Sequence, residues 1–240
     1  MKKTKYFSLI LIILLASCDR KNEAIKHEKP DPSADFIIAF GSCNNQNIEN
    51  ELWRPVMGNK PDLFIWGGDI IYTDTYDMSV MRKNYQKLKN DPSYNYFKDS
   101  IPVLGVWDDH DYGMNDGGAG YAKKDSAQQI FMDFFDLAPD DSRRKQKGIY
   151  FSKMYKRGEN SVRIILLDTR YFRSDLTRDP KGKKRYVPGS DSTATMLGEA
   201  QWEWFERELK HSKADFNIIV SSIQFLSDRH GYESWGNMPH

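Results

Sequence analysis

The residues best suited to chemistry form a short acidic cluster directly after the apolar segment 101–107. The cluster fills four consecutive positions with Asp108, Asp109, His110 and Asp111. Carboxylates that share a small site repel one another, and at least one takes up a proton unless a positive charge compensates for the repulsion. A bound cation provides that charge and dominates the local electrostatics. The cluster therefore favours a metal site.

Further candidate ligands follow two other apolar segments. Cys43 stands in Gly-Ser-Cys-Asn, and Asp69 and Tyr72 stand in Gly-Gly-Asp-Ile-Ile-Tyr. Carboxylate and phenolate oxygens are hard donors and a thiolate is soft, so this mixture suggests a highly charged transition metal, with ferric iron as the candidate. Oxygen ligands nearby would suit a second, harder ion such as calcium or magnesium. Taken alone, Cys43 is more simply read as a buried inert thiol, and Tyr72 as a core aromatic.

Five apolar segments predict the strands that would carry these residues: 35–40, 62–66, 101–107, 162–167 and 216–220. Their continuous apolar character is expected of strands covered on both faces. Helices are predicted at 77–90, at 129–137 after a capping box at 125–128, and at 198–212. The turn 157–160 predicts a hairpin. Because helices and strands alternate, the predicted fold class is α/β.

Ligands in α/β folds bind beyond the carboxyl ends of the strands. Here those ends carry side chains of ligand type: Cys43, Asp69, Tyr72, Asp109, His110 and Asp168. A single Asp after a strand is usually a turn residue or a helix cap. Several such ends together predict one shared site, on condition that the loops converge.

The N-terminal residues predict export. Three lysines precede a short apolar segment, as in a secretory signal, and the motif Leu-Ala-Ser-Cys that ends at Cys18 resembles a bacterial lipobox. We expect a signal peptide at 1–17, a lipid on Cys18 and a flexible tether at 18–34. The alternatives are an ordinary signal peptide or an uncleaved anchor. The chain would then be an exported lipoprotein of a bacterial cell envelope, held at the membrane through Cys18.

Net charge and cysteine content limit the binding partners and the disulfide bonds that we expect. The formal net charge of +1 gives no case for nucleic acid as a stable partner, and no protein partner is predicted. If Cys18, one of the two cysteines, is acylated, Cys43 has no partner for an intramolecular disulfide. Residues 35–240 are long enough for one well-packed domain.

The order of five motifs resembles the alkaline phosphatase D (PhoD-like) family of metallophosphoesterases. They are FGSCN, WGGDIIY, VWDDHDYG, LLDTRYFR and LGEAQWEWFERELKHS, and the likeness covers residues 36–240. The resemblance implies a four-layer sandwich, in which two mixed β-sheets pack face to face with helices outside. It also implies metal-dependent hydrolysis of phosphate monoesters, diesters or both, by attack of a metal-bound hydroxide on phosphorus.

The resemblance implies a role for each motif residue. Cys43 would bind iron, Tyr72 would be a phenolate ligand of iron, and Asp69 would bridge iron and a second ion, calcium or another divalent metal. By analogy with the related purple acid phosphatases, Asp109 would ligate the second metal. His110 would contact the phosphate or donate a proton to the leaving group, which makes it the candidate catalytic residue.

Three further residues are expected around the metals. Asp111 takes the place of a Glu seen in many family members and is expected on the substrate side. Arg170 is expected either to clamp the charge of the transition state or to form an ion pair with an acid such as Asp168. We interpret Asp108 as a structural cap of the chain. The alternative is that its side chain is a partner of the metal ligands.

One departure from the family pattern concerns the last residues. Family members normally continue into further strands that carry a Gly-Asp-x-His motif, and this sequence ends at Pro239-His240. Arg229-His230 imitates that motif only superficially. We therefore expect the last strands and the final ligand motif to be missing. The alternative to an enzyme is an inactive, truncated envelope lipoprotein that at most binds phosphate-bearing ligands.

Overall fold

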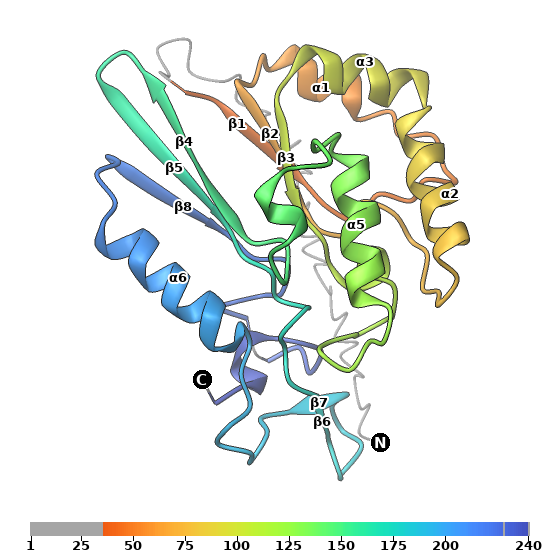
Figure 1. Ribbon diagram of the computed structural model, residues 1–240. Coiled ribbons are helices and arrows are strands. Elements are labelled where there is room, and N and C mark those ends of the chain that lie inside the picture. Colours follow the sequence, from red (N-terminus) through yellow and green to blue (C-terminus); the bar gives the residue numbers. More distant parts are fainter. Residues whose placement is uncertain (1–35, 228, 240) are drawn as a thin grey trace, which may run out of the picture.

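The computed structural model describes residues 36–227 and 229–239, which form a mixed α/β fold (Figure 1). The first sheet is parallel, in the order β1-β2-β3, with strands Ile38–Gly41, Leu63–Gly67 and Val103–Val106. The second has the order β4-β5-β8, with strands Phe151–Arg157, Asn160–Leu166 and Phe216–Val220. β5 pairs antiparallel with β4 and parallel with β8. A short ribbon joins β6 (Thr177–Arg178) to β7 (Tyr186–Val187).

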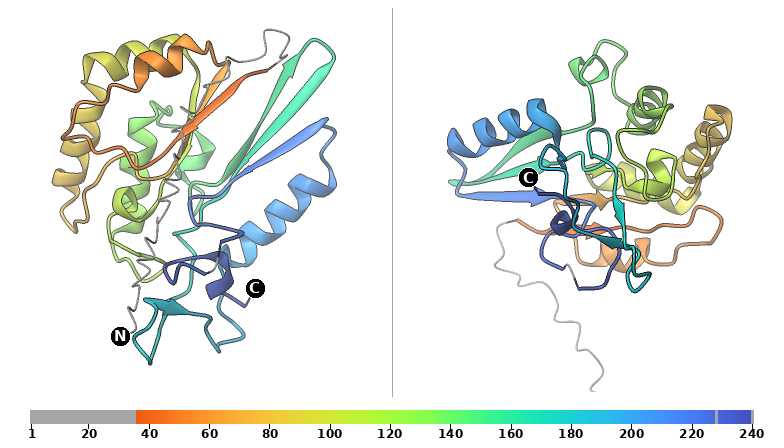
Figure 2. Two further views of the ribbon diagram at one scale, coloured as in Figure 1. Left: turned by 180° about the vertical axis from the view of Figure 1, so that it is seen from behind. Right: turned by 90° about the horizontal axis from the view of Figure 1, so that it is seen from below.

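The helices lie in two groups. α6 (Gly198–Lys210) lies beside the second sheet, and the longer of the other helices gather around the first sheet (Figures 1 and 2). The remaining α-helices are α1 Trp53–Gly58, α2 Met78–Lys89, α3 Pro92–Ser100, α4 Asp109–Tyr112 and α5 Lys124–Phe134. Two short 3₁₀ helices, η1 and η2, span Ser142–Arg144 and Trp235–Asn237.

Alternate side chains of β5 belong to two different apolar clusters, so the second sheet lies between them. Ile164 and Leu166 belong to the same core as β2, whereas Ile165 packs with side chains of α6 such as Trp202 and Phe205. Successive strand residues point to opposite faces, so β5 is covered on both. The first sheet is closed on the helix side by aromatic packing, in which the rings of Trp53 and Phe97 lie 4.8 Å apart.

The predicted strands and hairpin are confirmed, but the cover predicted for two strands is wrong. Among the described residues β8 pairs only with β5, and its apolar side chains are exposed: 64 % for Phe216 and 48 % for Ile219. On β1, Phe40 is 82 % exposed. Both strands lie at a sheet edge in the described residues. Their continuous apolar character therefore reflects strand propensity without burial on both faces.

The capping box predicted at 125–128 is also wrong. α5 begins at Lys124, after Lys123, and has no side-chain cap. The Asp125 carboxylate instead accepts a hydrogen bond from the Tyr171 hydroxyl, a partner 46 residues away. Asp125 therefore bonds Tyr171 in place of the local backbone partner that the capping motif predicts.

The N-terminal predictions fall outside the described residues: signal peptide 1–17, tether 18–34 and lipidation at Cys18. Within the part of the chain that the structure describes, no helix has the length and apolar character needed to cross a bilayer.

Candidate metal centre

The loops after β1 and β2 are joined by their backbones and by two amide side chains. Cys43 N donates to Gly68 O at 3.3 Å, and Asn44 N donates to Asp69 O at 2.8 Å. The Asn44 side chain donates to Ile70 O, and the Gln46 side chain bonds both backbone groups of residue 72. No pattern along the chain marks Asn44 or Gln46. Their bonds bring the two ligand-bearing loops together.

Cys43, Asp69 and Tyr72 meet as predicted. The Cys43 Sγ lies 3.7 Å from Asp69 Oδ2, and the Tyr72 hydroxyl is hydrogen-bonded with both neighbours. Cys43 and Asp69 have φ angles of 59° and 51°, values that non-glycine residues rarely adopt. Such strain persists where the surrounding structure holds it, and it concentrates at functional sites. The three side chains thus form one compact group of sulfur and oxygen donors.

A second group shares Asp69. Potential ligand atoms of Asp69, Asp109 and His110 all lie within 4.8 Å of one another. His110 N also donates to Asp69 Oδ1 at 3.3 Å. Because Asp69 belongs to both groups, its carboxylate lies where it could bridge two metal ions, as predicted for it.

Electrostatics in this group favour a cation. Burial, with repulsion from Asp108 and Asp109, raises the pKa of Asp69 to about 6. Burial and the neighbouring Asp69 and Cys43 raise the pKa of the Tyr72 phenol above its ordinary value. Burial lowers the pKa of His110, but the carboxylates of Asp109 and Asp74 outweigh burial and raise it. A positive ion would relieve this crowding of acids.

Asp109 is held in place from the protein surface. Its Oδ2 accepts a hydrogen bond of 2.7 Å from the backbone N–H of Asp116. Asp116 in turn accepts a hydrogen bond of 2.7 Å from the Tyr186 hydroxyl and forms an ion pair with Arg185, both near β7. Burial raises the pKa of Asp109, but Arg170 and the Asp116 N–H outweigh it and lower the pKa. Asp109 is therefore a fixed, ionised ligand candidate.

Asp111 lies beneath the site and is fully buried. Its Oδ2 accepts from Ile70 N at 2.9 Å, and its Oδ1 accepts from Asp108 N at 2.6 Å. Asp108 and Asp111 together form a capping box at the start of α4, as interpreted for Asp108. Asp111 thus ties the loop after β2 to the loop after β3.

Arg170 is buried in an ion-pair network. Its side chain is 1 % exposed, donates to Asp108 at 2.7 Å and binds the Glu233 carboxylate through both Nη atoms. Nη1 also donates to Gly117 O. Of the groups of Arg170, only the backbone N–H donates to Asp168, whose carboxylate also accepts from Trp107, Ile149 and Tyr171. The ion-pair alternative is thus the geometry observed, with Asp108 and Glu233 as partners in place of Asp168.

Sequence reasoning missed Glu233, and it noted Asp74 after its strand without giving it a role. Glu233 follows no apolar segment and carries no local signal. Asp74 does follow the Gly-Gly-Asp motif, and its Oδ2 lies 2.6 Å from His110 Nδ1. Its position five residues after Asp69 was the one signal that could have marked it.

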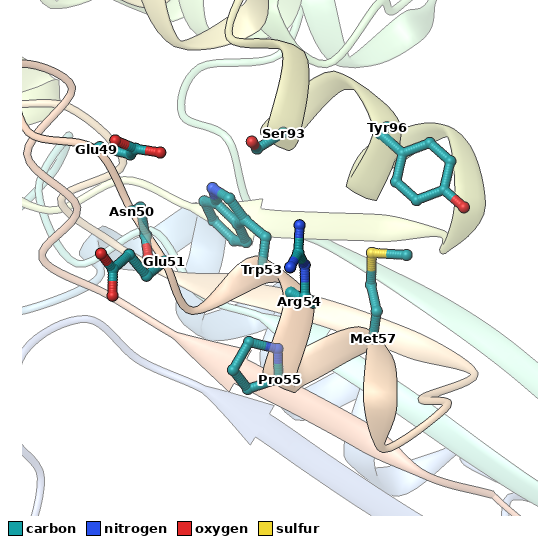
Figure 3. A pocket seen from close by; sticks show the side chains of 9 residues that line it. All are labelled: Glu49, Asn50, Glu51, Trp53, Arg54, Pro55, Met57, Ser93 and Tyr96. Atoms are coloured by element: carbon teal, nitrogen blue, oxygen red, sulfur yellow. The ribbon is translucent and has the colours of Figure 1, made fainter.

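Two cavities are alternative candidate sites. A cavity of about 540 Å³ lies between α1 and α3 (Figure 3), and none of the predicted site residues lines it. A second, of about 480 Å³, is lined by Asp108, Asp116, Arg170 and residues 222–224, 227, 230, 232 and 233. Its charged walls already pair with one another, so neither cavity displaces the metal centre as the candidate site.

Comparison with known proteins identifies the family and the fold. The chain matches the family described as PhoD-like phosphatase over residues 38–235. A solved structure titled "Structure of PhoD" is similar, with a TM-score of 0.62 and 20 % sequence identity, over 83 % of this chain and 44 % of that one. This chain therefore spans less than half the length of that protein, and at this identity the likeness concerns the fold. No curated protein matches. Because the family match covers most of the sequence, the chain belongs to the PhoD-like phosphatase family.

Proposed function

We propose that this chain is a metal-dependent phosphoester hydrolase. The observation that carries the proposal is the meeting of Cys43, Asp69 and Tyr72 with Asp109 and His110, from loops that follow three different strands. Family membership supplies the substrate class, a phosphate ester. Whether the ester is a monoester or a diester depends on the pocket walls, and the assay below includes both.

The donor set fits two different ions. The thiol of Cys43, the phenol of Tyr72 and the carboxylate of Asp69 suit ferric iron, and the oxygens of Asp69 and Asp109 suit calcium or another divalent metal. The hydrogen-bonded protons on Cys43 and Tyr72 are those that a metal would displace. When bound, the ions would supply positive charge that lowers the pKa of an attacking water and neutralises the phosphate.

The residues of the chain then have separate tasks. His110 would donate a hydrogen bond or a proton to the leaving oxygen, for which its raised pKa suits it. Arg170 and Asp111 would reach a phosphate only after releasing their present partners. We therefore assign them a supporting role, in which they hold the segment that carries Asp109 and His110.

The finer predictions about architecture and location belong to the same proposal. The shared core between the sheets, with α6 on the outer face of β5, supports a four-layer sandwich. The sequence before residue 35 supports export and a lipid on Cys18. Labelling of cells with a radioactive fatty acid should mark the wild-type chain but not Cys18→Ser.

The test is hydrolysis measured together with metal content. The full chain, supplied with iron and calcium, should hydrolyse 4-nitrophenyl phosphate or its bis ester. Asp69→Asn should lose both bound metal and hydrolysis, whereas Asp99→Asn, an exposed carboxylate beside Lys98, should lose neither. Metal binding without hydrolysis would favour the non-catalytic alternative. Unchanged metal content in Asp69→Asn would overturn the metal centre.

A further inference from the structure

His110 is enclosed by the three residues Tyr72, Thr73 and Asp74. The Asp74 carboxylate lies 2.6 Å from His110 Nδ1. The backbone N–H groups of Thr73 and Asp74 both donate to the His110 carbonyl, at 3.3 and 3.4 Å. The ring of Tyr72 lies 4.4 Å from the imidazole, tilted by 35°. One short segment, residues 72–74, thus contacts both the ring and the backbone of His110.

The segment itself is fixed by its neighbours. Asn84 of α2 donates to the Thr73 side chain at 3.0 Å, and Gln46 bonds both backbone groups of Tyr72. Asp74 has a φ angle of 29°, in the region that non-glycine residues avoid. A residue held there against its backbone preference needs support from the surrounding structure, and such support is found where geometry serves a function.

Stability does not explain the contact between Asp74 and His110. The two side chains are 43 % and 21 % exposed, and ion pairs this accessible to water contribute little to folding free energy. The contact between Asp74 and His110 is better explained as one that orients the imidazole ring. A neutral imidazole has one donor and one acceptor nitrogen, and an ionised carboxylate can only accept. The proton of the neutral ring must therefore sit on Nδ1, which leaves the lone pair on Nε2.

We infer that Asp74 is a positioning residue that fixes His110 as the Nδ1–H tautomer and so makes Nε2 the atom that acts in the reaction. This rests on the proposed function. When the ring is protonated, Nε2–H transfers its proton to the leaving oxygen as the ester bond breaks. The ring returns to the neutral Nδ1–H form. Partners of this kind typically change activity by about 10–100-fold when they are removed.

The tautomer can be measured without any hydrolysis. The full chain is labelled with ¹⁵N-histidine, kept free of metal by a chelator, and studied by long-range ¹H–¹⁵N NMR at a pH at which imidazole is neutral. His110→Gln identifies the His110 signals among those of the five histidines. Wild type should show the Nδ1–H form. Asp74→Ala, and Asp74→Asn, whose amide can donate to Nδ1, should shift His110 towards the Nε2–H form. Asp99→Asn should leave it unchanged.

A wild-type ring in the Nε2–H form, or a tautomer that is the same in Asp74→Ala, would overturn the inference. Should one variant fail to fold, as judged by the remaining NMR spectrum, the other carries the comparison. A spectrum that loses the Nδ1–H form only in the Asp74 variants supports it.

Kinetics add a second readout that a merely structural role would not move. In a chain that hydrolyses esters, Asp74→Asn should lower kcat about 10–100-fold with little change in KM. The loss should be larger for an alkyl phosphate than for 4-nitrophenyl phosphate, because nitrophenolate leaves without a proton. Equal losses for both substrates would contradict the role assigned to Nε2. No hydrolysis by wild type would count against the proposed function, and the NMR result would still decide the tautomer.

Discussion

β2 and β8 are both short apolar strands, yet they differ in their neighbouring strands and in the burial of their side chains. β2 lies between two parallel neighbours, and its side chains from Leu63 to Trp66 are buried. In the part of the chain that the structure describes, β8 has one neighbouring strand, and most of its side chains are exposed. The loop after β2 carries Asp69 and Tyr72 into the candidate metal centre. An apolar segment therefore predicts a strand, but the strand's neighbours decide whether it supports a site or forms a surface.

The two regions also depend on different forces. The loop end of the sheets buries charged groups that are stable only while paired, as Arg170 is with Asp108 and Glu233. In the described residues β8 is an edge strand with exposed apolar side chains, and such edges favour association with another chain. Substitutions should therefore destabilise the loop end strongly and change mainly the solution behaviour of the edge.

The largest effect is expected at Arg170. Arg170→Met leaves the carboxylates of Asp108 and Glu233 without their buried partner, which should lower the free energy of unfolding by about 3–5 kcal/mol. Arg82→Met is the matched control, because Arg82 pairs with Asp133 at the surface and should contribute less than about 1 kcal/mol. Urea denaturation measures both. Similar losses in the two variants would remove the distinction between the regions.

Gly68 should come next. It has φ of 107°, and a Cβ there would lie 2.5 Å from the Asp108 Cβ, so Gly68→Ala strains the backbone and separates the loops after β2 and β3. We expect a loss of about 2–4 kcal/mol. Gly158→Ala, in the open turn between β4 and β5, shares the positive φ but meets no atom within 4 Å and should lose about 1–2 kcal/mol. Thermal unfolding of the pair sharpens the comparison, and equal shifts would speak against close packing of the loops.

Asp69→Asn should change stability in the opposite direction. The folded pKa of about 6 lies above the ordinary 3.8, so the ionised carboxylate disfavours the metal-free fold once pH exceeds these values. At about pH 8, Asp69→Asn should stabilise metal-free protein by about 1–3 kcal/mol, and the gain should vanish below about pH 4. Denaturation across pH in chelator tests this. A loss of stability at about pH 8 would show that the carboxylate is not crowded by its neighbours.

The smallest change in folding free energy is expected at β8. Phe216→Lys and Ile219→Lys place charge on exposed edge positions and should alter stability by less than about 0.5 kcal/mol while reducing self-association. Leu226→Lys is the control, because Leu226 is exposed outside the strand. Sedimentation velocity measures the association. Equal effects of all three variants would mean that the edge itself is not the cause.

Much of the fold was predictable because its signals are local. The segment 216–220 coincides with β8, and the turn 157–160 joins β4 to β5. The candidate ligands Cys43, Asp69 and Tyr72 could be chosen because their residue types and their places after strands are visible along the chain. Their meeting was a prediction that the geometry confirms.

The partners of these residues could not be predicted, since they come from distant parts of the chain. Arg170 and Glu233 are separated by 63 residues, and Asp74 and His110 by 36. Such pairs leave no periodic pattern. The same reason explains Asp125, whose local capping motif gives way to Tyr171.

The hydrogen bonds from Tyr186 through Asp116 to Asp109 link a surface ribbon to a buried ligand candidate. Evolution or engineering can therefore retune this centre from outside it. A change of ribbon length or loss of the Tyr186 hydroxyl would change the orientation of the Asp109 carboxylate while the sequence of every motif stays the same. Relatives that share all the motif residues can thus differ in metal preference through a segment that no motif search would inspect.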